Sequence, residues 1–93
     1  MSSDPRSRAD LHGLTRPEAI RRVRETLIRA RALGAGEVEL VTGRGLSNRT
    51  GEPVLRGAVE AWLGSPEAAE FGIVQVERTH GGGALRVRLR RRA

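Results

Sequence analysis

The part of the chain that most constrains its fold is residues 10–42, which predict a strand, a helix and a second strand in that order. The helix has a clear beginning, because Thr15 and Glu18 form the T-x-x-E capping box, in which each side chain bonds to the other residue's backbone. Glycine favours the left-handed conformation that ends helices, so we expect this helix to end near Gly34 or Gly36. Between these limits, apolar residues recur at helical spacing at Ile20, Val23, Leu27 and Ala30. Strands joined through a helix are usually parallel, so the carboxyl ends of both strands should meet at one edge of a sheet.

The first predicted strand ends in Asp10, Leu11 and His12, and Gly13 follows. Side chains alternate along a strand, so Asp10 and His12 should share one face. His12 would then lie at the carboxyl end of the strand, where open α/β sheets bind ligands. The plainer alternative is a strand end at which both side chains bond to nearby backbone.

The second predicted strand, Glu37–Thr42, leads into Gly43, Arg44 and Gly45. Glycines on both sides of an arginine let backbone N–H groups approach an anion that the guanidinium also binds. A helix that begins at Pro53 follows this loop, and its N-terminal dipole would add positive charge to an anion site. The loop is neither a Walker loop nor a dinucleotide-binding loop, because it lacks the G-K-[ST] ending of the first and the third glycine of the second. A flexible loop without a ligand is the alternative.

The end of the chain predicts a β-hairpin. Its strands are Ile73–Arg78 and Ala84–Arg90, joined by residues 79–83. Alternation along the second of these strands turns Arg86 and Arg88 away from the helices. These arginines are candidates for nucleic-acid contact, and the alternative is a solubilised strand that discourages edge pairing.

The charge of the chain indicates a polyanionic partner. The sequence has 17 Lys and Arg residues, all of them arginine, against 11 Asp and Glu, which gives a net charge of +6. Arginine matches the geometry of phosphate, although a codon bias toward arginine would give the same composition. Aromatic residues are only 2% of the chain, which argues against a base-stacking platform for single strands.

Length and composition also limit the class of protein. A chain of 93 residues is one domain, and we expect residues 1–8 to be a disordered tail and residues 9–93 to form the domain. There is no cysteine, which excludes disulfides and thiolate metal sites. The sequence has no apolar run of membrane-spanning length and no hydrophobic N-terminal segment, so we expect a cytoplasmic monomer with no membrane partner.

Four segments, in their order and spacing, resemble the small MutS-related (Smr) domain family. They are Asp10-Leu11-His12-Gly13-Leu14-Thr15, Thr42-Gly43-Arg44-Gly45, Pro53-Val54-Leu55 and His80-Gly81-Gly82-Gly83-Ala84-Leu85. The resemblance covers residues 9–90. The family's usual opening is L-D-L-H-G, and Ala9 stands here in place of the first leucine. The longer loop through Gly51 looks like that of stand-alone bacterial members, which lack the MutS-type ATPase region.

The resemblance implies an α/β fold of the α+β two-layer kind, with the order βαβαββ and two helices packed on a four-stranded mixed sheet. It also implies DNA or RNA binding, with nicking or endonuclease activity and with a metal dependence that varies across the family. The functional positions that match this sequence are Asp10, His12, Gly13, Gly43, Arg44 and Gly45, with His80, Gly81 and Gly82 as a weaker match.

The main hypothesis is a nucleic-acid endonuclease that cuts phosphodiester bonds with little sequence specificity. His12 would transfer a proton as general base or acid, and Asp10 would orient it. Arg44, with the amides of Gly43 and Gly45, would stabilise the charge that develops on the phosphate. No dedicated metal site is predicted, and a role for Mg²⁺ or Mn²⁺ held by Asp10 is left open. The wider nucleic-acid surface is expected to include Thr42, Arg49, His80, Gly81, Gly82, Arg86 and Arg88.

Two alternatives use the same fold without this chemistry. The first is a non-catalytic DNA- or RNA-binding module with the same cleft. The second is a protein-interaction domain that docks on a larger repair or ribosome-associated assembly. Binding to phosphates falls steeply with salt, which separates the nucleic-acid hypotheses from the last one.

Overall fold

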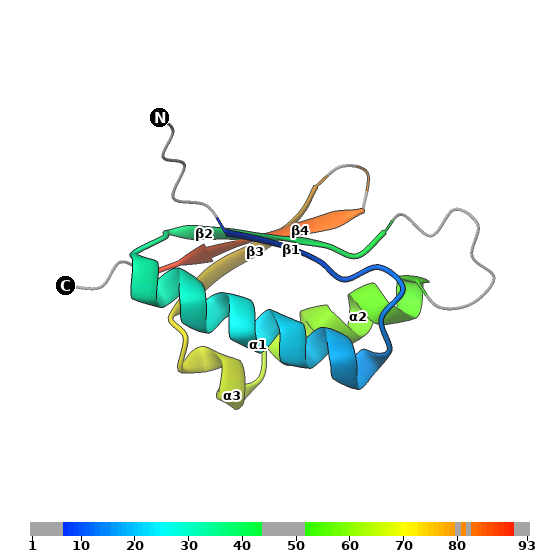
Figure 1. The fold of residues 1–93 in the computed structure, drawn as a ribbon, viewed down its shortest axis with the longest axis horizontal. Coiled ribbons are helices and arrows are strands. Elements are labelled where there is room, and N and C mark those ends of the chain that lie inside the picture. Colours follow the sequence, from blue (N-terminus) through cyan, green and yellow to red (C-terminus); the bar gives the residue numbers. More distant parts are fainter. Residues whose placement is uncertain (1–6, 44–51, 80, 82, 91–93) are drawn as a thin grey trace.

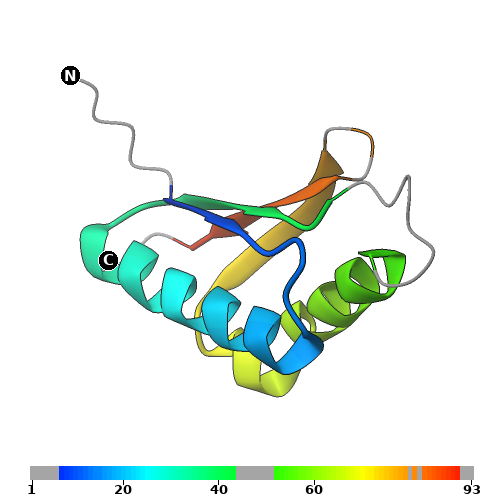
Figure 2. The same ribbon diagram turned by 45° about the vertical axis from the view of Figure 1, so that its right-hand side comes forward.

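The computed structural model describes residues 7–43, 52–79, 81 and 83–90. Its elements, in chain order, are β1 (Ser7–Asp10), α1 (Arg16–Leu33), β2 (Glu37–Val41), α2 (Glu52–Leu63), α3 (Pro66–Ala69), β3 (Ile73–Thr79) and β4 (Ala84–Leu89). Figures 1 and 2 show these helices packed on one face of the sheet, and no described helix lies on the other face. The predicted two-layer architecture is confirmed, with α3 as an additional short helix.

The four strands lie in the order β1-β2-β4-β3. β1 pairs with β2 in parallel, whereas β4 pairs antiparallel with both β2 and β3. β3 therefore runs in the same direction as β1 and β2. The ends of these three strands and the start of β4 lie together, and this part of the molecule is called the carboxyl end of the sheet below. The predicted parallel crossover and the predicted hairpin are both confirmed.

β1 both begins and ends earlier than the sequence predicts. Ser7 and Arg8, which the sequence predicts to lie in the disordered tail, pair with β2 and belong to the strand. The stretch has few β-forming residues, so it carries no strand signal of its own, and the neighbouring strand makes it extended. The strand ends at Asp10, so His12 lies in the turn that follows.

α1 has the ends that the sequence predicts. The Thr15 hydroxyl accepts a hydrogen bond from the Glu18 N–H (3.3 Å), and the Glu18 carboxylate accepts one from the Thr15 N–H (2.9 Å). Hydrogen bonding of the Glu18 carboxylate, first to the Thr15 backbone and then to the Thr15 side chain, lowers the pKa of Glu18. Gly34 ends the helix with a φ of 77°. Within the described ranges, no helix is long and apolar enough to cross a membrane.

The core lies between α1 and the sheet. α1 buries one stripe of its surface, which consists of Ala19, Val23, Thr26, Leu27 and Ala30. Alternate residues of β2 and β4 face this stripe and are fully buried, namely Val38, Leu40, Leu85 and Val87. Full burial of a Leu or Val side chain contributes about 1.5–3 kcal/mol relative to exposure. This packing holds α1 in one position, with its N-terminus at the carboxyl end of the sheet.

Candidate active site

Backbone hydrogen bonds bring three separate segments together at the carboxyl end of the sheet (Figure 1). The Leu11 N–H donates to the Val41 carbonyl (2.7 Å), which ties the end of β1 to the end of β2. The N–H groups of Thr42 and Gly43 both donate to the Gly83 carbonyl at 3.0 Å, which ties β2 to the turn between β3 and β4. The three segments thus form one surface, although the sequence separates them.

Asp10 and His12 contact each other at this surface. Asp10 Oδ1 lies 2.9 Å from His12 Nδ1 and also accepts a hydrogen bond from the His12 backbone N–H at 3.1 Å. An ionised carboxylate only accepts hydrogen bonds, so Nδ1 carries the proton in this contact. Nε2 is the ring nitrogen that the contact does not engage. The side chains of His12 and Asp10 are 63% and 59% exposed, so a substrate can reach both.

The turn after β1 produces this contact. The Leu14 N–H donates to the Leu11 carbonyl (3.1 Å), which closes a tight turn around His12 and Gly13. Gly13 has a φ of 84°, a left-handed conformation that residues with a side chain rarely adopt. Leu11 is fully buried and anchors the turn in the core. The structure therefore brings Asp10 and His12 together as predicted, through a turn rather than through alternation along a strand.

The contact also fixes the charge of Asp10. The hydrogen bond from the His12 ring, followed by the bond from the His12 backbone N–H, lowers the pKa of Asp10 below its usual value. Asp10 is therefore ionised at neutral pH. A carboxylate in this position orients the imidazole and stabilises positive charge that develops on it during proton transfer.

Thr42 and Gly43 contribute differently from the prediction. The Gly43 N–H, which the sequence-based hypothesis directs at a phosphate, donates to the Gly83 carbonyl instead. Thr42 is fully buried, and its hydroxyl has no hydrogen-bond partner among the described residues. Both residues therefore serve to join β2 to the β3–β4 turn. Gly83 is not among the predicted site residues, yet it accepts both bonds. The run of glycines at residues 81–83 is the sequence signal that could have indicated it.

Several predicted site residues lie outside the described residues, namely Arg44, Gly45, Arg49, His80 and Gly82. Gly81 is described and exposed, and its φ of 65° is left-handed. The contribution of the loop after Gly43 to a phosphate site therefore stays a prediction.

The uncovered face of the sheet carries the two predicted arginines of β4. Arg86 Nε lies 2.9 Å from Glu37 Oε2, and Arg86 Nη1 lies 3.9 Å from Glu77 Oε2, so glutamates of β2 and β3 share this guanidinium. Arg88 is exposed and has no ion-pair partner in the described part of the chain. Exposed ion pairs are weak, but these two offset the charge of Arg86. The face is thus more balanced in charge than the basic stripe that the sequence suggests.

The described residues do not fit a dedicated site for a divalent metal ion. Within these ranges, no group of three or more His, Cys, Asp or Glu side chains is placed to hold an ion. Oδ1 of Asp10, the carboxylate at the candidate site, already accepts two hydrogen bonds from His12.

Comparison with known proteins finds a matching family and similar solved structures. The family model described as "Smr domain" matches residues 9–90. The structure is similar to the crystal structure of the Smr domain of Thermus thermophilus MutS2, with 30% identity, a TM-score of 0.73 and coverage of 90% of this chain and 98% of that chain. Its fold is also similar to the solution structure of the B3BP Smr domain, with 24% identity, a TM-score of 0.64 and coverage of 87% and 75% of the two chains. The comparison with curated proteins finds no match.

Proposed function

The chain belongs to the Smr domain family, and from this premise we propose that it binds nucleic acid and hydrolyses phosphodiester bonds with little sequence specificity. The contact between Asp10 and His12 supports this function best, because it places an oriented imidazole at an exposed end of the sheet. Histidine titrates near neutral pH and is the commonest group that transfers protons in enzymes. The phosphodiester is the group that DNA and RNA share, and both are candidate substrates.

In the proposed reaction, His12 acts as a general base. Nε2 takes a proton from a water molecule, whose oxygen bonds to phosphorus while the bond to the leaving oxygen breaks. Solvent supplies the proton that the leaving oxygen takes up. Asp10 keeps its hydrogen bond to Nδ1–H and offsets the positive charge on the ring. General base catalysis of this kind contributes about 10²–10⁴-fold to the rate.

Phosphate binding has less support from the described residues than proton transfer has. The Gly43 amide is engaged by Gly83, which leaves Arg44 and the Gly45 amide as the groups that the proposal assigns to the phosphate. Contacts to phosphate oxygens carry no information about the bases. A site built on such contacts would cut with little sequence specificity.

The variant His12→Ala tests this function. The His12 side chain is 63% exposed, so its removal should leave the fold intact, which circular dichroism would verify. We expect nearly native affinity for nucleic acid and a loss of at least about 10²-fold in cleavage rate. The rates would be measured on supercoiled plasmid and on a structured RNA, each with and without a chelator.

Glu70→Ala is a suitable control, because Glu70 is exposed and lies just before β3, away from the carboxyl end of the sheet. This variant should cut like the native protein. Unchanged cleavage by His12→Ala would contradict the catalytic role and favour the non-catalytic binding module. Cleavage that stops in chelator would instead assign Asp10 to holding a divalent ion.

A further inference from the structure

The arginines on the two sides of α1 differ in what they contact. Arg24 and Arg31 lie on the side that faces α2 and α3. Arg24 Nη2 donates to Glu67 Oε2 at 2.7 Å, and its guanidinium lies 5.8 Å from the centre of the Trp62 ring. Arg31 Nη1 donates to the Phe71 carbonyl at 2.6 Å. Both side chains thus hold α1 to neighbouring elements.

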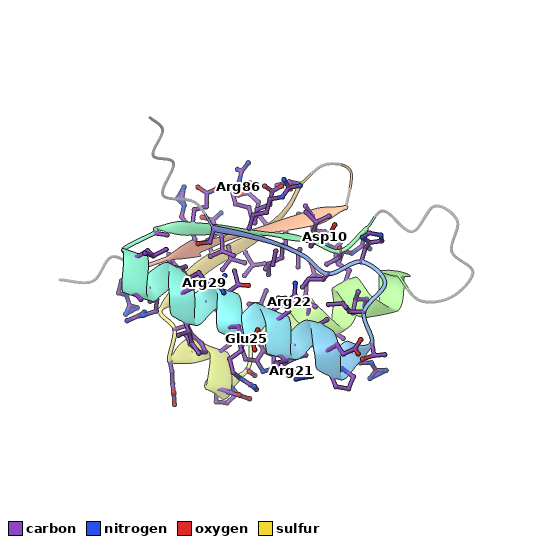
Figure 3. The ribbon with its side chains drawn as sticks, in the orientation of Figure 1. Asp10, Arg21, Arg22, Glu25, Arg29 and Arg86 are labelled. Carbon is purple, nitrogen blue, oxygen red and sulfur yellow. The ribbon has the colours of Figure 1, made fainter. Side chains whose placement is uncertain are left out.

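Arg22 and Arg29 lie on the other side of the same helix, turned toward β1 (Figure 3). They are seven positions apart in the sequence, so they form a line about 10.5 Å long that runs parallel to the helix axis. Both side chains are exposed, and neither guanidinium bonds to a described residue. Arg24 and Arg31 have the same spacing, so the two pairs differ in their surroundings and not in their sequence pattern.

This line of positive charge leads to the candidate active site. α1 begins at Arg16, shortly after the turn that carries His12. A shallow hollow of about 290 Å³ lies along the start of the helix, and its walls are Leu14, Glu18, Arg21, Arg22 and Glu25. A strand bound at His12 that followed this hollow would therefore reach Arg22 first and Arg29 about two helical turns later.

α1 also carries much of the excess positive charge of the chain. Its sequence contains six arginines and two glutamates, whereas the Arg86 charge on the uncovered sheet face is offset by Glu37 and Glu77. A polyanion is attracted to the surface whose cations are not already compensated. The side of α1 that carries Arg22 and Arg29 also carries Glu18 and Glu25, but among the described residues no ion pair joins these carboxylates to the two guanidinium groups.

We propose that a nucleic-acid strand leaving the active site runs along this side of α1, with Arg22 and Arg29 each binding a backbone phosphate. This proposal rests on the proposed function, since it extends the same site. Guanidinium groups bind phosphate through two parallel N–H bonds. The guanidinium groups of Arg22 and Arg29 would break no bond to a described residue when they bind phosphate. Glu25, which lies between them in the sequence, and Glu18, which lines the same hollow, are acidic residues that oppose binding here.

The salt dependence of binding tests the path. Each phosphate contact contributes about 0.7–0.9 to the slope of log K against log salt concentration. The double variant Arg22→Gln, Arg29→Gln should therefore lower the slope by about 1.4–1.8 and weaken binding. Glu25→Gln should strengthen binding, because it removes an opposing charge. The probes are a short DNA duplex of random sequence and an RNA hairpin, and a loss confined to one of them assigns the path to that nucleic acid.

Arg24→Gln is the matched control, because it removes the same charge from the opposite side of the same helix. It should leave the slope unchanged, whereas Arg22→Gln alone should lower it by about 0.7–0.9. Equal slopes for these two single variants would show that only net charge matters and would overturn the proposal. Native binding with an unchanged slope in the double variant would also overturn it. Native protein that bound neither probe would instead contradict the proposed function itself.

Discussion

At each end of the sheet, similar backbone hydrogen bonds join neighbouring segments, but the polar side chains at the two ends make different contacts. At the end opposite the candidate site, the Arg90 N–H donates to the Gly72 carbonyl (2.7 Å), and the Arg31 guanidinium adds its bond to the Phe71 carbonyl (2.6 Å). A charged side chain thus stabilises the start of β3 against α1. This end of the molecule uses its polar groups to hold the fold.

At the carboxyl end, backbone groups make the connections. The bonds from Thr42 and Gly43 to Gly83 join the segments there, while Asp10 and His12 bond to each other and stay exposed. A side chain that holds the fold cannot also bind a substrate without weakening the structure. The difference leaves two polar side chains exposed at the end of the sheet where the proposed reaction would take place.

Two glycines, one at each end of the sheet, also differ in how closely side chains surround them. Gly72 and Gly13 both have left-handed backbones, with φ of 73° and 84°. A Cβ at Gly72 would lie 2.6 Å from Arg31 Nη1, whereas a Cβ at Gly13 would have no such neighbour within 4 Å. A side chain at Gly72 would therefore strain the backbone and also displace the Arg31 guanidinium, whereas one at Gly13 would strain the backbone alone.

The largest expected effect on stability is that of Gly72→Ala. The left-handed backbone costs about 1–2 kcal/mol for alanine, and displacing Arg31 from the Phe71 carbonyl costs about 1 kcal/mol more. We therefore expect the free energy of unfolding, measured by urea denaturation, to fall by about 2–3 kcal/mol. The fraction that stays folded should still cut nucleic acid at the native rate.

Gly57→Ala is the control for this experiment. Gly57 is an exposed residue within α2, and a Cβ there would have no neighbour within 4 Å. Alanine in a helix interior should stabilise the protein by about 0.5–1 kcal/mol. If Gly72→Ala lowered the free energy of unfolding no more than Gly13→Ala does, the stabilising role of Arg31 beside Gly72 would be contradicted.

Gly13→Ala should have a smaller effect on stability and a larger effect on cleavage. Only the strain of the left-handed backbone applies, which amounts to about 1–2 kcal/mol. Relief of this strain would shift the turn and separate His12 from Asp10, so we expect cleavage to fall more than nucleic-acid affinity. Parallel urea titrations and plasmid-nicking rates would measure both effects. Native cleavage by a destabilised Gly13→Ala protein would show that the turn does not position the imidazole.

The smallest expected effect on stability is that of Asp10→Asn, and it depends on pH. The pKa of Asp10 is lowered in the folded protein, so its charge stabilises the fold above the ordinary pKa of 3.8, and this contribution is lost as pH falls further. Asparagine keeps an oxygen that can accept from His12 but removes the charge. Thermal unfolding should show the native chain slightly more stable than the variant at neutral pH. The difference should shrink below about pH 4, and a difference independent of pH would contradict this assignment.

The sequence by itself determined the features that depend on close neighbours. The capping box of Thr15 and Glu18 and the contact between Asp10 and His12 are found as predicted, and the helix ends at Gly34, one of the two glycines expected to end it. The alternation of buried and exposed residues in β4 is found as well. Backbone bonding over a few residues and the periodicity of side chains decide these features, so they can be read without the rest of the fold.

Tertiary structure decided which groups were already engaged. Nothing local distinguishes Arg22 from Arg24, but the packing of α1 brings Glu67 beside Arg24 alone. The sequence predicts that the Gly43 N–H faces an anion, but the position of β4 places the Gly83 carbonyl next to it. A sequence records the charge and the hydrogen-bonding groups of each residue. The partners that satisfy them come from distant segments, and only the packing of those segments fixes which partners they are.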